Sequence, residues 1–279
     1  PVYTNNEDAD TVAVDYTRAA IKWTPGDDFE AVLTYMSQEG EYGGRRQTTS
    51  GPDGWGEYYG EYEIGAVINE ASSNESEFTS LEMTYDLGFA TLSSSTSFYE
   101  RTYEGTSDNT GFFASKGWLY WYGYGLMTRP AIAAERQNSE EAFVQEVRLV
   151  SNGDQQFDWT MGVFYMDQEA SAAQQTRARG FQEWWAAASG PAPYQGFLAE
   201  PPYSYIGLYY DPTTNITFDW THEREFKDFA LFGEVTWDLS ETLSATVGAR
   251  YFDNKDKVTS QTSFPIWYLS NPVVTDTNK

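Results

Sequence analysis

Four pairs of alternating stretches, each joined by a short polar turn, constrain the fold of this 279-residue chain more than any other feature. The turns carry glycine chemistry, as in Pro25-Gly26, Gly88 and Asn152-Gly153. Alternating runs around such turns are a strong short-range signal for β-hairpins. The sequence therefore predicts an all-β, antiparallel up-and-down chain. The paired stretches are 15–23 with 29–36, 78–85 with 89–99, 142–151 with 157–168, and 226–237 with 243–253.

The third and fourth hairpins each have one apolar and one polar face. The apolar set includes Val147, Leu149, Leu231 and Val235, with Trp237 and Tyr251 at its two ends. The polar set includes Glu146, Arg148, Glu234 and Arg250. Aromatic side chains favour membrane–water interfaces. We therefore expect the apolar face to meet lipid and the polar face to line a wet barrel interior.

Between the hairpins lie long connections, at 37–77, 100–141, 169–225 and from 254 onward. Short turns at one end and long loops at the other are typical of outer-membrane barrels. The expected strands, of about 9–12 residues, match a tilted membrane crossing. The same alternation also fits a soluble β-sandwich with its apolar face turned to a core, and that alternative stays open.

The amino-acid composition excludes several classes of binding site and catalysis. The chain has no Cys, a single His and a net charge of −25. Lack of Cys excludes disulfide scaffolds, Cys-ligated zinc and thiol catalysis, and the negative charge disfavours nucleic-acid binding. Aromatic residues make up 17% of the chain, yet no stretch approaches the roughly 20 apolar residues of a membrane helix. A transmembrane β-barrel has no such requirement.

Two segments resemble hairpins of TonB-dependent outer-membrane receptors. The first is Gln145-Glu146-Val147-Arg148-Leu149-Val150-Ser151, followed after the turn by Phe157-Asp158-Trp159-Thr160-Met161-Gly162-Val163-Phe164-Tyr165. The second is Ala230-Leu231-Phe232-Gly233-Glu234-Val235-Thr236-Trp237, followed by Leu243 to Phe252 with Gly248-Ala249-Arg250-Tyr251. The segments 22–28 and 85–92 also read as strand-turn-strand units of that family.

The resemblance implies a 22-stranded barrel, an N-terminal plug and energy supplied by the inner-membrane TonB complex through that plug. The cargo would be a nutrient or siderophore-like substrate bound at extracellular loops, with no enzymatic step. Residues 1–279 would then form part of one barrel domain, from the middle of a longer receptor in the bacterial outer membrane, in contact with lipid and lipopolysaccharide. The first residues have no signal-peptide features.

Candidate site residues fall into two groups. Loop aromatics could stack on sugar rings or flat ligands, or pack together as a lid; they are Trp118, Trp121, Trp184 and Trp185. Glu146, Arg148, Glu234 and Arg250 could line the barrel lumen, or be paired across strands. We expect no metal, cofactor or catalytic residue. Acidic groups at 7–10 and 140–141 lack calcium-loop spacing, and His222 is expected to be a solvated loop residue.

Three other functions remain open from sequence. A complete eight-stranded barrel acting as adhesin or structural protein would close by pairing its first and last strands. An outer-membrane hydrolase would need a Ser/His pair on its outer face, with His222 as the only available base. A soluble β-sandwich binding protein would be recovered without detergent.

Overall fold

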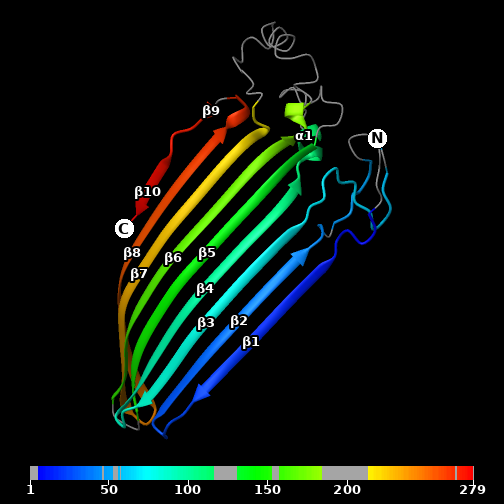
Figure 1. Cartoon of the computed structure of the whole chain (residues 1–279). Coiled ribbons are helices and arrows are strands. Elements are labelled where there is room, and N and C mark those ends of the chain that lie inside the picture. Colours follow the sequence, from blue (N-terminus) through cyan, green and yellow to red (C-terminus); the bar gives the residue numbers. More distant parts are fainter. Residues whose placement is uncertain are drawn as a thin grey trace.

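The computed structural model describes residues 6–45, 47–52, 56, 58–115, 131–152, 157–183, 213–267 and 269–278. Within these ranges all strands belong to one twisted, antiparallel sheet (Figure 1). Eight long strands each pair with their neighbours in sequence. They are β1 (Val12–Trp23), β2 (Phe29–Tyr42), β3 (Ser72–Asp86), β4 (Ala90–Asp108), β5 (Ala131–Ser151), β6 (Phe157–Arg179), β7 (Ile216–Ser240) and β8 (Leu243–Phe264).

Short elements lie at the loop end of the sheet. The helix α1 (Thr110–Ser115) follows β4, and the 3-10 turn η3 (Pro265–Trp267) follows β8. The chain then forms β9 (Leu269–Ser270) and β10 (Val274–Asn278), both paired with β8. None of the helical segments within the described ranges is long and apolar enough to cross a membrane.

The four predicted hairpins are all present, with their short turns at one end and the long connections at the other (Figure 1). In the β3–β4 turn, Gly88 adopts a φ of 83°, a left-handed conformation that glycine tolerates best. The Asp86 carboxylate accepts its N–H at 2.7 Å. In the β1–β2 hairpin the Trp23 and Phe29 rings meet edge to face, 5.4 Å between centroids.

The strands are longer than the alternation predicts. β7 has 25 residues where the sequence predicts 12, and β6 has 23. The added residues extend β5 to β8 at the loop end. Most of them are small or polar, and apolar residues occur there only in short runs such as 131–134 and the alternating Ile216, Phe218 and Trp220. At about 3.3 Å per residue, β7 is roughly 80 Å long, well beyond a membrane crossing of 9–11 residues.

Directly paired residues point to the same side of a sheet, so the register defines two faces. One face carries a band of apolar side chains and is called the banded face; it includes the row Val147, Val163, Leu231 and Tyr251. The arginine face carries the row Arg148, Gly162, Phe232 and Arg250. On β7 from Thr221 to Phe229, arginine-face residues are half-buried and banded-face residues are exposed. The sheet therefore curls around the arginine face.

The described residues contain no second layer against this sheet. Most buried apolar residues are alanines, and the largest ones, Ile132, Phe181 and Ile266, gather at the loop end. Large apolar side chains of the banded face stay exposed, Met161 at 52% and Val247 at 76%. The structure therefore gives no support to a two-sheet sandwich. It also gives none to a closed eight-stranded barrel, because among the described strands β1 pairs only with β2.

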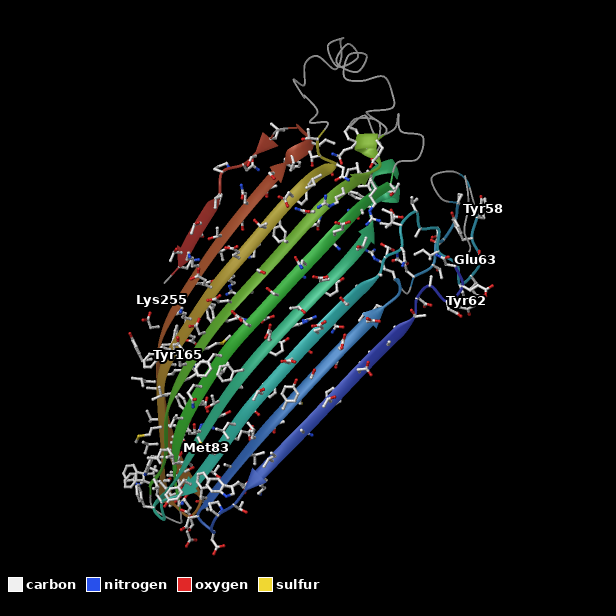
Figure 2. All side chains as sticks on the ribbon, in the orientation of Figure 1. Tyr58, Tyr62, Glu63, Met83, Tyr165 and Lys255 are labelled. Carbon is white, nitrogen blue, oxygen red and sulfur yellow. The ribbon has the colours of Figure 1, made fainter. Side chains whose placement is uncertain are left out.

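The connection between β2 and β3 is tied to the end of β4. Asp108 accepts the Val67 N–H at 2.5 Å and the Ile68 N–H at 3.2 Å. Its own N–H donates to the buried Glu70 carboxylate, which also pairs with Arg45 at 3.1 Å. Near the middle of this connection Tyr58 and Tyr62 point into solvent (Figure 2).

We expect Asp108→Ala to release this connection without unfolding the sheet. Hydrogen bonds to charged groups contribute about 1.5–3 kcal/mol, so exchange at the Val67 and Ile68 amides should accelerate about tenfold or more. Hydrogen–deuterium exchange measures this directly. Asp86→Ala, which removes a turn contact at the opposite end, serves as the control. Unchanged exchange at Val67 and Ile68 would contradict the role of Asp108.

Candidate functional site

The four predicted lumen residues lie on the arginine face, in the half of the sheet near the turns. Arg148 pairs with Glu146 of its own strand, 2.6 Å from Nη2 to Oε1. The nearest carboxylate to Arg250 is Asp228, at 3.9 Å, and Glu234 lies opposite Gly248 in the register. Among the described residues, Arg250 therefore pairs with Asp228 and not with Glu234.

Phe232 is the centre of this cluster. Its ring lies between two guanidinium groups, with Arg148 Cζ 5.6 Å and Arg250 Cζ 6.0 Å from the ring centroid. Such cation–π contacts contribute about 0.5–1 kcal/mol each at exposed sites. The ring lies over Gly162, where an added Cβ would collide with it. The sequence pattern identified the arginines but neither Phe232 nor Gly162 as part of the cluster.

Two acceptors beside the cluster have no hydrogen-bond partner among the described residues. They are Asp228 Oδ1 and Asn254 Oδ1, which are buried and face each other across β7 and β8. Buried acceptors of this kind normally find a donor. This part of the arginine face can therefore accept N–H or O–H groups from another segment.

The loop-end half of the arginine face carries a second set of rings and charges. His222 stacks on Trp220, with 5.7 Å between centroids and 19° between planes, and its Nδ1 lies 2.8 Å from Ser260 Oγ. Arg224 forms a bidentate pair with Asp256 at 2.8 and 3.0 Å. The hydrogen bond from Arg224 holds the pKa of the Asp256 carboxyl below its usual range.

The expectation that His222 is a solvated loop residue is wrong. His222 lies inside β7 and is half-buried, because β7 already begins at Ile216 and pairs with β6 along this stretch. The Ser260–His222 pair lies on the arginine face, and among the described residues no carboxylate bonds the His222 ring. The hydrolase alternative therefore gains no support from this geometry.

The loop aromatics Trp118, Trp121, Trp184 and Trp185 lie outside the described residues. Over the part of the chain that the structure describes, no group of three or more His, Asp and Glu side chains is arranged to hold a metal ion.

The loop-end half of the banded face is rich in carboxylates. One row runs Glu77, Glu100, Glu141, Glu169 and Glu225, and ends at Lys257. Like charges directly opposite each other destabilise a sheet. At one end of the row, Lys257 Nζ lies 2.6 Å from Glu225 and neutralises its charge. At the other end, the Tyr35 hydroxyl donates a hydrogen bond to Glu77 at 3.0 Å.

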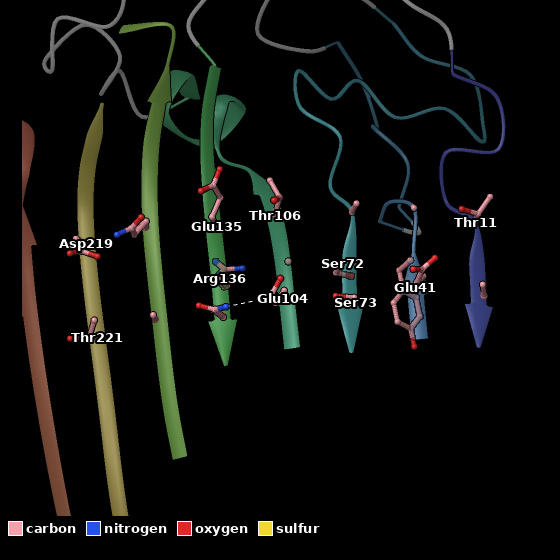
Figure 3. Close-up of a pocket in the computed structure, with 18 residues that line it drawn as sticks. Thr11, Glu41, Ser72, Ser73, Glu104, Thr106, Glu135, Arg136, Asp219 and Thr221 are labelled. Atoms are coloured by element: carbon pink, nitrogen blue, oxygen red, sulfur yellow. Dashed lines mark hydrogen bonds between the residues drawn. The ribbon is translucent and has the colours of Figure 1, made fainter. Parts of the chain in front are cut away.

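Two rows further toward the loops, the banded face holds a groove of about 900 Å³ (Figure 3). Two adjacent rows of paired residues line most of it. The first row is Ala13, Glu41, Ser73, Glu104, Gln137, Ala173 and Thr221. The second is Thr106, Glu135, Gln175 and Asp219. The groove therefore crosses seven strands, roughly 29 Å at about 4.8 Å per strand.

Comparison with known proteins identifies the fold. No protein-family model and no curated protein matches the sequence. Among solved structures, the chain is similar to FyuA, the ferric yersiniabactin uptake receptor of Yersinia pestis, with 12% identity and a TM-score of 0.60. The match covers 96% of this chain and 34% of FyuA. The siderophore receptor PiuA of Acinetobacter baumannii matches with 11% identity and a TM-score of 0.44, over 92% of this chain and 42% of PiuA.

The likeness to FyuA confirms the expected fold class, an antiparallel meander that matches part of a TonB-dependent receptor barrel. The chain spans about a third of the length of that receptor. At this level of identity the likeness concerns the fold, and the resemblance predicted from the two hairpin motifs is confirmed at that level.

Proposed function

We propose that this protein is part of an outer-membrane uptake receptor of a Gram-negative bacterium, which imports a nutrient or siderophore-like substrate. The observation that carries the proposal is the exposed apolar band on a one-layer sheet. Large contiguous apolar patches that stay exposed mark contact with a membrane or a partner, and the barrel fold of FyuA favours the membrane.

In this proposal the banded face contacts lipid. On β8 the band runs from Leu243 to Tyr251, nine residues of alternating apolar side chains, which matches the 9–11 residues of a tilted crossing. Aromatic side chains mark both edges, as membrane barrels require. Phe157 and Trp237 stack at the turn edge with 5.5 Å between centroids, and Tyr165 and Phe229 pair in register at the other.

The arginine face then lines the lumen, where Arg148, Arg250 and the unpaired acceptors would contact a plug. The chain would be one part of a single barrel domain. Substrate would bind at the extracellular loops and pass through the barrel with energy from the TonB complex. No bond is made or broken in this mechanism, so the protein would act as a receptor and transporter.

Gene deletion tests the uptake function. We expect the deletion strain to lose growth on at least one ferric chelate supplied as sole iron source, and a plasmid copy to restore it. Dissipating the proton-motive force should abolish uptake by the complemented strain. Uptake that is unchanged by deletion across nutrient chelates, cobalamin and oligosaccharides would contradict the proposal. Recovery of the protein in the detergent-free soluble fraction would contradict its membrane location.

A further inference from the structure

The loop-end half of the arginine face carries an unpaired cation beside two stacked rings, and we propose that these groups bind an aromatic carboxylate. The groups are Arg136 on β5 and the rings of Trp220 and His222 on β7. The inference rests on the proposed function, because the arginine face lines a lumen only if the sheet is part of a barrel. It names a class of substrate and places its contacts on the strands.

Arg136 is an exposed cation that forms no ion pair with any described residue. Its Nε donates to Gln174 Oε1 at 2.9 Å and its Nη1 donates to Ser107 Oγ at 3.1 Å, and both acceptors are neutral. By contrast, Arg148 and Arg224 each pair with a carboxylate. A guanidinium has five N–H groups, so the remaining donors of Arg136 are available to an anionic ligand.

The carboxylates on this part of the sheet do not neutralise Arg136. From the row of Phe226 to the loops, β5 to β8 place Glu140 and Asp256 on the arginine face. Asp256 is held by its bidentate pair with Arg224. Glu140 lies four positions from Arg136 along β5. That is about 13 Å of strand, which exceeds the Debye length of about 8 Å at physiological salt.

Trp220 and His222 supply a surface on which a flat ligand can stack. Their ring planes are 19° apart, with 5.7 Å between centroids. His222 Nδ1 lies 2.8 Å from Ser260 Oγ, so this contact fixes the imidazole and leaves its Nε2 available for a polar substituent of the ligand. Both rings are half-buried, and aromatic groups gain from offset stacking on such a surface.

The register brings the cation and the rings within reach of one ligand. Arg136, Gln174 and Trp220 form one row across β5, β6 and β7. Two strand spacings separate Arg136 from Trp220, about 10 Å at about 4.8 Å per strand. In the next row the small side chain of Ala172 lies beside His222. A flat molecule can therefore lie over β6, with its carboxylate at the guanidinium and its ring against Trp220 or His222.

The combination of a guanidinium and stacked rings selects the class of ligand. A carboxylate matches the fork of a guanidinium and forms charge-assisted hydrogen bonds with it, and an arene uses the rings. An uncharged arene would leave the donors of Arg136 unused. An aliphatic acid or inorganic phosphate would leave the rings unused. An aromatic carboxylate uses both.

The measurement is calorimetric titration of the complete, detergent-extracted receptor with cinnamate. Two further probes separate the charge from the ring. Cinnamamide keeps the ring and lacks the charge, and cyclohexanepropionate keeps the charge and lacks the aromatic ring. We expect cinnamate to bind, cinnamamide to bind about tenfold or more weakly, and cyclohexanepropionate to bind more weakly by a factor of about two to ten.

Four variants assign the binding to these side chains. Arg136→Gln should weaken cinnamate binding about tenfold or more and leave cinnamamide binding unchanged. Trp220→Leu should weaken the binding of both by a factor of about two to ten. Arg101→Gln is the charge control, because Arg101 lies opposite Glu140 on the same face, further toward the turns. Phe226→Leu is the ring control, six positions from Trp220 on the same face of β7. Both controls should bind cinnamate as the unaltered protein does.

The inference is overturned by any of three results: no cinnamate binding by the unaltered protein, equally tight binding of cinnamamide, or equal losses in Arg101→Gln and Arg136→Gln. The growth test of the deletion strain separates this inference from the receptor proposal. Loss of growth on a ferric chelate without cinnamate binding rejects the aromatic carboxylate site and leaves the receptor proposal standing. Uptake that is unchanged by deletion rejects the receptor proposal itself.

Discussion

Val163→Arg should leave most of the protein outside the membrane. Val163 lies in the middle of the banded face, exposed between Val147 and Leu231. An arginine on the lipid face of a barrel costs about 2–4 kcal/mol at the bilayer midplane, a large part of a typical folding free energy. We expect a loss of the heat-modifiable folded band on gels, and a fall of about 2–4 kcal/mol in the free energy of unfolding measured in bilayers.

Thr160→Arg is the control for this result. Thr160 lies three residues earlier on β6, on the arginine face opposite Glu234, where a cation gains a carboxylate neighbour. The control should fold and insert as the unaltered protein does. If both variants insert equally well, the banded face does not meet lipid. If both variants lose insertion to the same extent, the two faces of the sheet do not differ in their contact with lipid.

The sequence predicted the hairpins because their determinants are local. Gly88, Pro25-Gly26 and the apolar alternation act within a few residues of each turn, and all four hairpins formed where expected. Strand ends at the loops were not predictable in the same way. There most residues are small or polar, and the apolar alternation shortens to a few residues such as Phe218 and Trp220. The local signal is therefore weak, and pairing with the neighbouring strand decides where the strand ends.

The rows across the sheet were beyond prediction for a different reason. Glu100 and Glu141 lie directly opposite each other although they are 41 positions apart in the sequence. Alternation assigns each glutamate to a face of its own strand, but the row depends on register across the long loops. The same holds for the groove, whose lining comes from β1 to β7.

Gly162 offers the sharpest test of the cluster on the arginine face. A Cβ at this position collides with the Phe232 ring, so Gly162→Ala forces the ring away from Arg148 and Arg250. Overpacking typically costs about 1–3 kcal/mol, and displacement removes cation–π contacts of about 0.5–1 kcal/mol each. We expect the free energy of unfolding to fall by about 2–3 kcal/mol, the larger part from the collision.

Gly248→Ala is the matched control, since it adds the same methyl group to the same face. The nearest atoms to a Cβ there are at ordinary contact distance, 3.4 Å. An alanine that fits a strand is more favourable than glycine by roughly 0.5–1 kcal/mol, so this variant should be neutral or slightly more stable. Equal destabilisation of both variants would mean that any side chain on this face is harmful, whatever lies above it.

A double-mutant cycle then assigns the cost to the ring. In Phe232→Ala the methyl group at position 162 meets no aromatic neighbour, so adding Gly162→Ala should cost little in that background. The expected coupling is at least about 1 kcal/mol, within the range for residues in contact. Additive losses of free energy would mean that the cost of Gly162→Ala arises in the β6 backbone. The close approach of Phe232 to Gly162 would then not help to hold the two arginines on the face of the sheet.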